Sequence, residues 1–558
     1  MIALLATLYL ALGLVNLDFR RGWWQGQYRR LVVGVPIIAA FVYMTMPPLV
    51  FPQAATLLLL TLVPNTIYSL LLAARTFIIS RRLISFGRAP VLPYVLACVV
   101  VGGYALILAV APVVDASGLR NLAAVTQTNA PAPAADLAHV RIVPIESARF
   151  AGDKVIGQLG TYYAAGAYNV QLAQGRLVWV TALEFHDPIQ WIFRRTSPGV
   201  IIVSAESPDA AAELRQRTAM RYIPSAYLND NLYRHVYLTY GSEEILETTL
   251  QLDDTGSPYE LATLGRPTIG WSGERVTAVV IVDPATGAMR RIPREDFASL
   301  PQWVSRVYPP DIALEYNDWF GRYVHGFWNS LFAKRDVHLP ARGDVSGLLL
   351  GGNRFVWFVD HTSPAATDAS MTGFTYMDSR TGEMTYYTAS GGEFNSIGAE
   401  NAVIANPLVR QGRLLPTQPI LYNLFGQNTW VVPVIADNGK FQTLALVQAT
   451  NGRVVVGNAS APSAAADAFS AYRDLLGGRI AGSGSAEGVT GVVDRVAQGG
   501  TSIYFTVRGN QRVFVLRDAA NPAALLMHGG DRVKFVIQGE DANSTSIRDF
   551  QNLSLGRH

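Results

Sequence analysis

The sequence has 558 residues and a single cysteine, Cys98. One cysteine cannot form a disulfide within the chain, and it excludes zinc sites built from CxxC pairs. A large chain without disulfides is more typical of a bacterial envelope than of an animal secretory pathway. Charged residues are also scarce, at 16% of the chain, and the formal net charge is only +3. Because no basic cluster is interleaved with aromatic residues, the composition argues against a nucleic-acid partner.

The common catalytic motifs are missing as well. The sequence contains no HExxH, no G-x-S-x-G and no Walker loop. His325 and His338 have no carboxylate at ligand spacing, and Asp360 and His361 are neighbours that would point to opposite faces of a strand. We therefore expect no metal, no cofactor and no catalytic residue, although a site assembled only in three dimensions remains the alternative.

One short motif resembles the D-T-G loop of aspartic proteases. Asp254, Thr255 and Gly256 lie in "LQLDDTGSPYEL". That chemistry needs a second such loop, because two carboxylates share one proton and activate a water molecule. The segment is dense in turn-forming residues, which favours a β-turn between two strands.

Hydrophobic residues make up 50% of the chain, and four apolar segments stand within the first 114 residues. They are Met1 to Val15, Leu31 to Met46, Ala54 to Ala74 and Val91 to Val114. A helix needs about 20 residues to span a bilayer, so the last two segments have the full length and the first two are shorter. The four segments carry no Asp, Glu, Lys, Arg or His. We predict a four-helix membrane anchor, and a bonded Asn65 in a kinked helix in preference to a transport pathway.

The arginines between these segments predict the orientation of the anchor. They are Arg20, Arg21, Arg29 and Arg30 after the first segment, and Arg75, Arg81, Arg82 and Arg88 after the third. The loop "PPLVFPQ" between the second and third segments has none. Because basic loops stay cytoplasmic, the N-terminus should lie outside a bacterial cytoplasmic membrane, and everything after Val114 should be extracytoplasmic. Membrane lipid is the first expected partner.

Composition divides the rest of the chain. Residues 115–140 are rich in Ala, Pro, Asn and Thr and predict a spacer. Residues 141–476 alternate short strands with amphipathic helices, as in an α+β domain, and 477–488 form a Gly/Ser linker. Residues 489–558 give about five short strands with Gly and Asn turns, which predicts a small, OB-like β-barrel.

A strand, a turn and a second strand recur three times in the α+β region. The stretches are "VVIVDPATGAMRRI", "FTYMDSRTGEMTYY" and "LALVQATNGRVVVG". Gly287, Gly382 and Gly452 supply the positive φ of a tight hairpin, and Asp283 and Asp378 are turn formers. Because one active site would not need three copies, we interpret these residues as structural turns.

A strand of similar pattern precedes each of the three corners, and a fourth lies further upstream. The strands are "GRLVWVTALEF", "SPYELATLG", "NRFVWFVDH" and "QNTWVVPVIA". This arrangement, from about Arg141 to Leu476, resembles the PepSY-like module, in which a helix packs on a small antiparallel sheet. The resemblance implies binding, often of an envelope hydrolase, and it brings no catalytic residues. The corner glycines are unequally spaced, by 95 and then 70 residues, which predicts one merged domain.

Aromatic residues are densest between Trp303 and Trp328. Trp319, Tyr323 and Phe327 follow a helical i, i+4, i+8 spacing, which favours packing on a sheet. Aromatic residues also dominate binding surfaces. The candidate partner-binding residues are therefore Trp303, Tyr308, Trp319, Tyr323 and Trp328.

Taken together, the sequence predicts a non-catalytic scaffold or regulator that binds an envelope protein or assembles with copies of itself. A cell-envelope hydrolase and an accessory subunit of a membrane complex are the alternatives.

Overall fold

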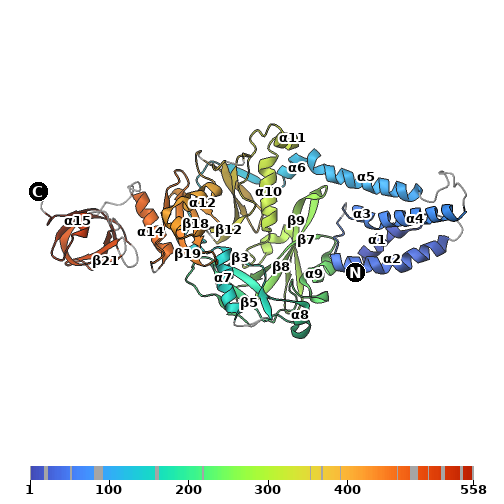
Figure 1. Cartoon of the computed structure of the whole chain (residues 1–558), viewed down its shortest axis with the longest axis horizontal. Coiled ribbons are helices and arrows are strands. Elements are labelled where there is room, and N and C mark those ends of the chain that lie inside the picture. Colours follow the sequence, from blue (N-terminus) through green and yellow to red (C-terminus); the bar gives the residue numbers. More distant parts are fainter. Residues whose placement is uncertain are drawn as a thin grey trace. The chain divides into compact units, whose positions relative to one another are not determined.

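The computed structural model describes residues 2–17, 23–50, 53–80, 92–157, 162–216, 219–351, 353–365, 368–389, 391–461, 463–477, 488–499, 502–516, 522–540 and 545–555. They belong to two compact units, Met1–Phe469 and Ser470–His558 (Figure 1). The first unit contains the apolar helices and an α+β region, and the second contains a small barrel. Apart from Gly477 and Gly488, the predicted Gly/Ser linker lies outside the described residues.

Four apolar stretches of helix open the first unit. They are α1 (Ile2–Ala11) with η1 (Leu12–Leu14), α2 (Trp23–Thr45), α3 (Gln53–Leu57) with α4 (Leu59–Ser80), and α5 (Leu92–Val114). Three spans, Trp23–Thr45, Gln53–Leu72 and Leu92–Val114, are long and apolar enough to cross a membrane, whereas Ile2–Leu14 is apolar but shorter. Five arginines of the predicted basic loops, Arg20, Arg21, Arg81, Arg82 and Arg88, lie outside the described residues.

Asn65 joins the first helix to α4. Its buried side-chain amide donates to the carbonyl oxygens of Gly13 at 2.9 Å and Val15 at 3.3 Å. The last carbonyls of a helix lack partners within the helix, so a donor from a neighbouring helix stabilises this end. The amide of Asn65, in the middle of this apolar segment, is therefore used for a bond between helices.

The opposite ends of α2 and α5 meet the α+β region. The Tyr237 hydroxyl donates to the carbonyl of Pro47 at 2.9 Å, and the amide of Leu49 donates to the carbonyl of Gly241 at 2.8 Å. Gly270, at a hairpin tip, lies so close to the Leu108 carbonyl of α5 that a side chain could not fit there. The arginine-free loop after α2 thus packs against the α+β region.

The stretch 115–140 is a packed part of the first unit, which differs from the predicted spacer. It contains α6 (Ala116–Arg120), β1 (Val125–Thr128) and η3 (Leu137–His139). β1 pairs in parallel with β15 (Met384–Thr388). Asn423 donates to the Ala132 carbonyl at 2.6 Å, so side-chain and backbone bonds compensate for the lack of bulky residues.

The α+β region is built from four consecutive units, here called repeats 1 to 4, in which a helix precedes an antiparallel meander. Repeat 1 comprises α7 (Ile145–Ile156), β2 (Tyr163–Ala165), β3 (Asn169–Ala173), β4 (Arg176–Phe185), α8 (Pro188–Arg194), β5 (Val200–Ser204) and β6 (Glu213–Arg215). Repeat 2 comprises η4 (Leu228–Asp230), α9 (Leu232–Tyr240), β7 (Glu244–Leu252), β8 (Pro258–Ile269), β9 (Ser272–Val282), β10 (Met289–Pro293) and η5 (Arg294–Ser299).

The later repeats follow the same order. Repeat 3 comprises α10 (Pro310–Arg322), α11 (Gly326–Leu331), β11 (Leu339–Pro340), β12 (Ser346–Leu350), β13 (Arg354–Thr362), β14 (Gly373–Asp378) and β15. Repeat 4 comprises α12 (Ser396–Ala405), α13 (Pro407–Gln411), β16 (Leu415–Pro416), β17 (Ile420–Leu424), β18 (Gln427–Ile435), β19 (Phe441–Gln448) and β20 (Val454–Val456). α14 (Ala464–Gly477) follows.

The recurrent corners close as tight hairpins. At Asp283 the backbone amide donates to the Ala288 carbonyl at 2.9 Å, and the carboxylate accepts the amide of Ala285 at 2.8 Å. Asp378 makes the same two kinds of bond, with Glu383 and Arg380. Gly287, Gly382 and Gly452 have φ values of 76°, 79° and 67°, which favour glycine. The two aspartates are therefore held by their own turns.

One bond recurs in all four repeats and ties each sheet to the start of its helix. The backbone amides of Val143, Tyr222, Tyr308 and Phe394 donate to the carbonyls of Ala205, Pro284, Ser379 and Ala449 at 2.7–3.0 Å. Each donor lies shortly before the helix of its repeat, and each acceptor lies one or two residues after the strand that enters the corner. We call this bond the latch.

Tryptophan strengthens the latch in three repeats. The indole N–H groups of Trp179, Trp357 and Trp430 donate to the carbonyls of the latch residues Val143, Tyr308 and Phe394 at 2.8–2.9 Å. These indoles occupy one register position, because they pair with Val203, Met377 and Val447 near the ends of the next strands. The same position in repeat 2, opposite Val282, is Glu260.

Two buried arginines join the repeats to one another. Arg306 donates to Glu247 of β7 at 3.0 Å and to Asn169 of β3 at 3.3 Å, and its guanidinium lies 4.7 Å from the ring centre of Trp357. It therefore links repeats 1, 2 and 3. The meanders form one merged domain.

Arg141 has the same role for repeats 1, 3 and 4. Its guanidinium donates to the Gly347 carbonyl and to Gln418 Oε1, both at 3.1 Å, and lies 5.4 Å from the ring centre of Trp179. A buried charge needs such partners, because solvent no longer stabilises it.

The second unit contains a closed barrel in the order β21-β22-β23-β25-β24. The strands are β21 (Gly488–Gly499), β22 (Ser502–Val507), β23 (Val513–Leu516), β24 (Arg532–Glu540) and β25 (Thr545–Asn552), with α15 (Pro522–Leu525) between β23 and β24. Its core includes Phe505, Phe514, Phe535 and Phe550. The sequence prediction of a small barrel is confirmed at this level.

The Arg306 cross-link predicts a large stability effect. Arg306→Ala removes a buried guanidinium and leaves the carboxylate of Glu247, which is only 22% exposed, without its partner. The free energy of unfolding in detergent should therefore fall by about 3 kcal/mol. Arg354→Ala, at an exposed arginine of β13, is the matched control and should change it by less than about 0.5 kcal/mol. Equal effects of the two substitutions in denaturant titrations would contradict the role of Arg306.

Candidate functional site

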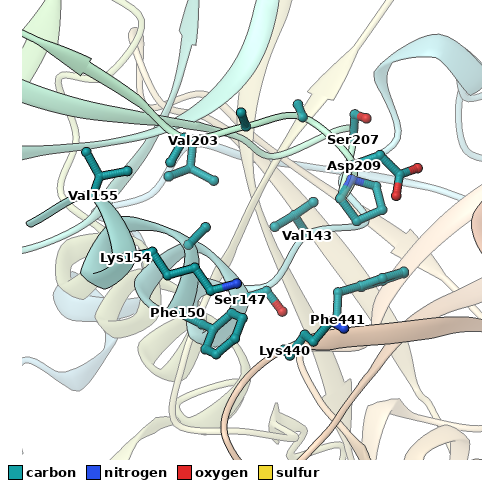
Figure 2. Close-up of a pocket in the computed structure, with 15 residues that line it drawn as sticks. Val143, Ser147, Phe150, Lys154, Val155, Val203, Ser207, Asp209, Lys440 and Phe441 are labelled. Atoms are coloured by element: carbon teal, nitrogen blue, oxygen red, sulfur yellow. The ribbon is translucent and has the colours of Figure 1, made fainter. Parts of the chain in front are cut away.

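A half-open cleft lies between repeat 1 and repeat 4 (Figure 2). Its volume is about 490 Å³. One wall is α7, which begins directly after the latch residue Val143 and Pro144. The other walls are the segment after β5 and the start of β19. The side chains of this lining include Ser147, Phe150, Lys154, Asp209, Lys440 and Phe441.

Two lysines enter this cleft from opposite walls. Figure 2 shows Lys154 reaching from α7 toward the opening and Lys440 entering from the β18–β19 hairpin. The whole sequence contains only four lysines, the others being Lys334 and Lys534, so two of four converge on one cleft. Among the described residues, neither ammonium group has a carboxylate at ion-pair distance. The cleft is therefore suited to an anion.

The remaining lining is mostly apolar, apart from Ser147, Ser207 and the exposed Asp209, whose carboxylate is the one acidic group of the lining. Phe150 lies 4.2 Å from the Lys154 ammonium, measured to the ring centre, and Phe441 faces the same opening. Ser147 donates its hydroxyl proton to the Gly439 carbonyl at 2.8 Å, so this hydroxyl is used to join α7 to the β18–β19 turn. A ligand with an acidic group beside an apolar surface fits these walls best.

A chain of polar side chains is buried beneath α10. Asn317 Oδ1 accepts the Thr375 hydroxyl at 2.6 Å and lies 2.8 Å from His361 Nε2. Because this oxygen can only accept, His361 must carry its proton on Nε2. Its Nδ1 then accepts a hydrogen bond from His338 Nδ1 at 2.9 Å. These hydrogen bonds hold α10 on β13 and β14.

Burial keeps both imidazoles neutral. Desolvation, with a smaller effect of the nearby Arg120, lowers the pKa of His338 to about 4. Desolvation followed by the proximity of His338 holds the pKa of His361 well below its usual value. His361, Asn317 and Thr375 are fully buried and touch no carboxylate, so the geometry is that of a structural network.

An acidic cleft of about 500 Å³ lies where repeat 2 and α10 meet the end of α2. Glu244, Glu274 and Glu315 line it. Burial, and then the charge of Glu274, raises the pKa of Glu315 to about 7. Burial and Glu274 also raise the pKa of Glu244. Among these carboxyls, Glu315 therefore titrates close to neutral pH.

Glu260, which replaces the latch tryptophan in repeat 2, is also buried. Desolvation, and then the proximity of Glu184, raises its pKa well above the usual value. Burial likewise raises the pKa of Glu184, which accepts a hydrogen bond from Ser225. No sequence motif marks this pair, because Glu184 and Glu260 lie on strands of different repeats. Only the register of the sheets brings Glu260 into the tryptophan position.

The five candidate partner-binding residues are spread over different environments. Tyr308 is a buried latch residue, and Trp303 stacks on Tyr259 with ring centres 5.2 Å apart. Trp319 and Tyr323 are half-buried, and Trp328 is 65% exposed. The expected continuous helix is broken, because α10 ends at Arg322 and Gly326, the first residue of α11, has a φ of 82°.

The D-T-G segment is a turn. Asp253 Oδ1 accepts the amides of Thr255 and Ser257 at 2.9 and 2.8 Å, and Asp254 is exposed. The described residues contain no group of three or more His, Cys, Asp or Glu arranged to hold a metal ion. The cleft lined by Lys154 and Lys440 is therefore taken as the candidate ligand site.

No protein-family description matches this chain, and no curated protein sequence matches it. Solved structures of Synechocystis apocarotenoid oxygenase show a weak likeness. The cobalt-substituted form is 9% identical, with 54% of this chain and 48% of that chain covered and a TM-score of 0.14. A variant of the same enzyme is 8% identical, with 71% and 67% covered and a TM-score of 0.16. The chain spans about half the length of the first of these.

The buried histidine pair predicts a loss of stability in acid. Unfolded histidine binds a proton near pH 6.5, whereas folded His338 does so only near pH 4. Neutral His338 therefore makes its full contribution to the free energy of unfolding above pH 6.5. This contribution, on the order of 3 kcal/mol, is lost as the pH falls toward 4.

The test compares unfolding of the wild type with that of His338→Gln across this range. Glu315 acts in the opposite direction, since its raised pKa favours the folded state as the pH falls, but it is present in both proteins. The wild type should lose more stability in acid than the variant. Parallel curves would argue against neutral burial of His338.

Buried Glu260 predicts the opposite pH dependence of stability. Because the folded pKa of Glu260 is raised, its contribution is present at low pH and is lost as the pH rises. Glu260→Gln should therefore be more stable than the wild type at pH 8 and similar near pH 5 in thermal unfolding. Glu383→Gln, at an exposed glutamate, is the control and should follow the wild type at both pH values.

Proposed function

We propose that this protein is a non-catalytic, membrane-anchored scaffold or regulator that binds an acidic segment of an envelope protein in the cleft between repeats 1 and 4. The convergence of Lys154 and Lys440 on that cleft carries the proposal. Two ammonium groups on opposite walls attract carboxylates, and Phe150 and Phe441 offer apolar contact beside them.

The three membrane-length helices support an anchor in the bacterial cytoplasmic membrane. The shorter first helix joins this anchor through the hydrogen bond from Asn65 to the Gly13 carbonyl. Pro47 and Leu49, in the loop without arginines, contact the α+β region. Because loops without basic residues tend to lie outside the cytoplasm, these contacts support an extracytoplasmic position for that region. A bacterial location is further supported by the absence of any possible disulfide.

The repeats support a likeness to PepSY-like modules, since each has a helix before an antiparallel meander. The second unit, a five-stranded closed barrel, supports an OB-like assignment. Binding of a protein partner agrees with both. In repeat 1 the helix of the module, α7, forms a wall of the cleft, so ligand binding there would act on the module itself.

The proposal predicts selective binding of acidic peptides. Full-length protein in mild detergent should bind short fluorescent peptides rich in Glu and Leu more tightly than matched Gln and Leu or Lys and Leu peptides, as measured by anisotropy. The double variant Lys154→Gln with Lys440→Gln should bind the acidic peptide with roughly ten- to a hundredfold lower affinity, because two charge contacts are lost. Binding that ignores peptide charge would refute the proposal.

Lys534→Gln removes an exposed lysine from the barrel unit and is the matched control. It lowers the net charge without touching the cleft, so it should leave the affinity unchanged. Affinity purification of the wild type and the double variant, with mass spectrometry, then identifies the natural partner. A partner that is lost only with the double variant belongs to the cleft, and a second copy of the chain would indicate self-assembly.

A further inference from the structure

Two short helices far apart in the sequence expose the same pattern of side chains. In α8 the exposed apolar residues are Ile189, Ile192 and Phe193, and in the α11 segment they are Trp328, Leu331 and Phe332. Both sets have the spacing i, i+3, i+4, so each forms one apolar face. Phe193 is 80% exposed and Phe332 is 76% exposed.

Basic residues follow both faces directly. Arg194 and Arg195 come after Phe193, and Lys334 and Arg335 come shortly after Phe332, all of them exposed. An apolar face bordered by Lys or Arg is typical of helices that lie in the headgroup region of a bilayer. Single exposed apolar residues need no explanation, but two clusters with the same pattern do.

Both helices are connected to the outer ends of the membrane-length helices. α11 lies against α6, which begins two residues after α5 ends at Val114. On the other side, Trp191 of α8 packs on Tyr227 with ring centres 5.6 Å apart. The neighbouring Asn229 accepts a hydrogen bond at 3.1 Å from Tyr43, near the end of α2.

A third exposed aromatic residue, Trp271, also lies beside the apolar helices. Trp271 follows Gly270, which touches Leu108 of α5 and accepts a hydrogen bond from Gln53 at 2.6 Å. Leu108 precedes the end of α5 by six residues, or about 9 Å at 1.5 Å per residue. Tryptophan is enriched at this depth, where its ring meets both acyl chains and headgroups.

We propose that α8, the Trp271 turn and α11 form a collar that rests in the outer leaflet, with its apolar side chains among the acyl chains and its basic residues on anionic phospholipid headgroups. This rests on the membrane placement in the proposed function. The collar would hold the α+β region at a fixed tilt, so that the cleft with two lysines keeps a constant height above the membrane.

Nitroxide spin labels test the collar. Because the chain has one cysteine, a Cys98→Ala background accepts single labels at Phe193→Cys and Phe332→Cys. Full-length protein is reconstituted in vesicles of phosphatidylcholine and phosphatidylglycerol. Accessibility to oxygen and to a water-soluble nickel complex is then measured by electron paramagnetic resonance. Both labels should be reached by oxygen and protected from nickel.

Two control labels separate the possible failures. Val100→Cys lies on an exposed face of α5 and reports whether the helices are inserted at all, whereas Leu408→Cys is exposed on α13 in repeat 4. If the label at residue 100 is inserted but nickel reaches the labels at residues 193 and 332 as readily as that at 408, the collar proposal is wrong. The membrane anchor would still hold in that case. Protection from both reagents would also overturn the collar, because a protein contact shields both.

Lipid charge provides the second test. Replacing Arg194, Arg195, Lys334 and Arg335 with Gln should increase nickel access to the label at residue 332 in the mixed vesicles. The same change should have little effect in pure phosphatidylcholine. An equal response in the two kinds of vesicle would refute the headgroup contact.

Discussion

The α+β region depends on the burial of two guanidinium groups, those of Arg306 and Arg141. Each is removed from water and must find partners on several sheets, because a buried charge without partners is costly. Arg306 finds them on repeats 1, 2 and 3, and Arg141 finds them on repeats 1, 3 and 4. Any shift of one repeat would leave these groups unpaired. The cleft between the first and last repeats exists because this cross-linking fixes repeats that are distant in the sequence.

The latch is the second constraint, and its one departure is informative. It fastens the start of each helix to the corner of its own sheet, and a tryptophan completes it in three repeats. Repeat 2 has Glu260 in that position. Repeat 2 is also the repeat whose edges meet the apolar helices, through Tyr237 and Gly270. The symmetry of the fold is thus broken where the region joins the membrane-length helices.

Hairpins, apolar helices and the small barrel could be predicted because they depend on local patterns. A glycine with positive φ after an aspartate is enough to indicate a corner such as that at Gly287. The opposed faces of Asp360 and His361 were likewise predictable, and in the structure Asp360 accepts the Ser396 amide while His361 faces Asn317. The pairing of His338 with His361 was not, because it depends on how β11, which follows His338, pairs with β13. The break at Gly326, inside a regular aromatic spacing, was also missed.

The sequence by itself determined the membrane-length helices, the turn residues and the absence of disulfides, since each follows from chain length, backbone geometry or residue type. The tertiary structure alone decided which side chains meet. It brought Lys154 and Lys440 into one cleft, although each is an isolated lysine 286 residues from the other. It also placed the exposed faces of α8 and α11 near the ends of α2 and α5. Such contacts depend on the packing of whole repeats, and no local pattern encodes them.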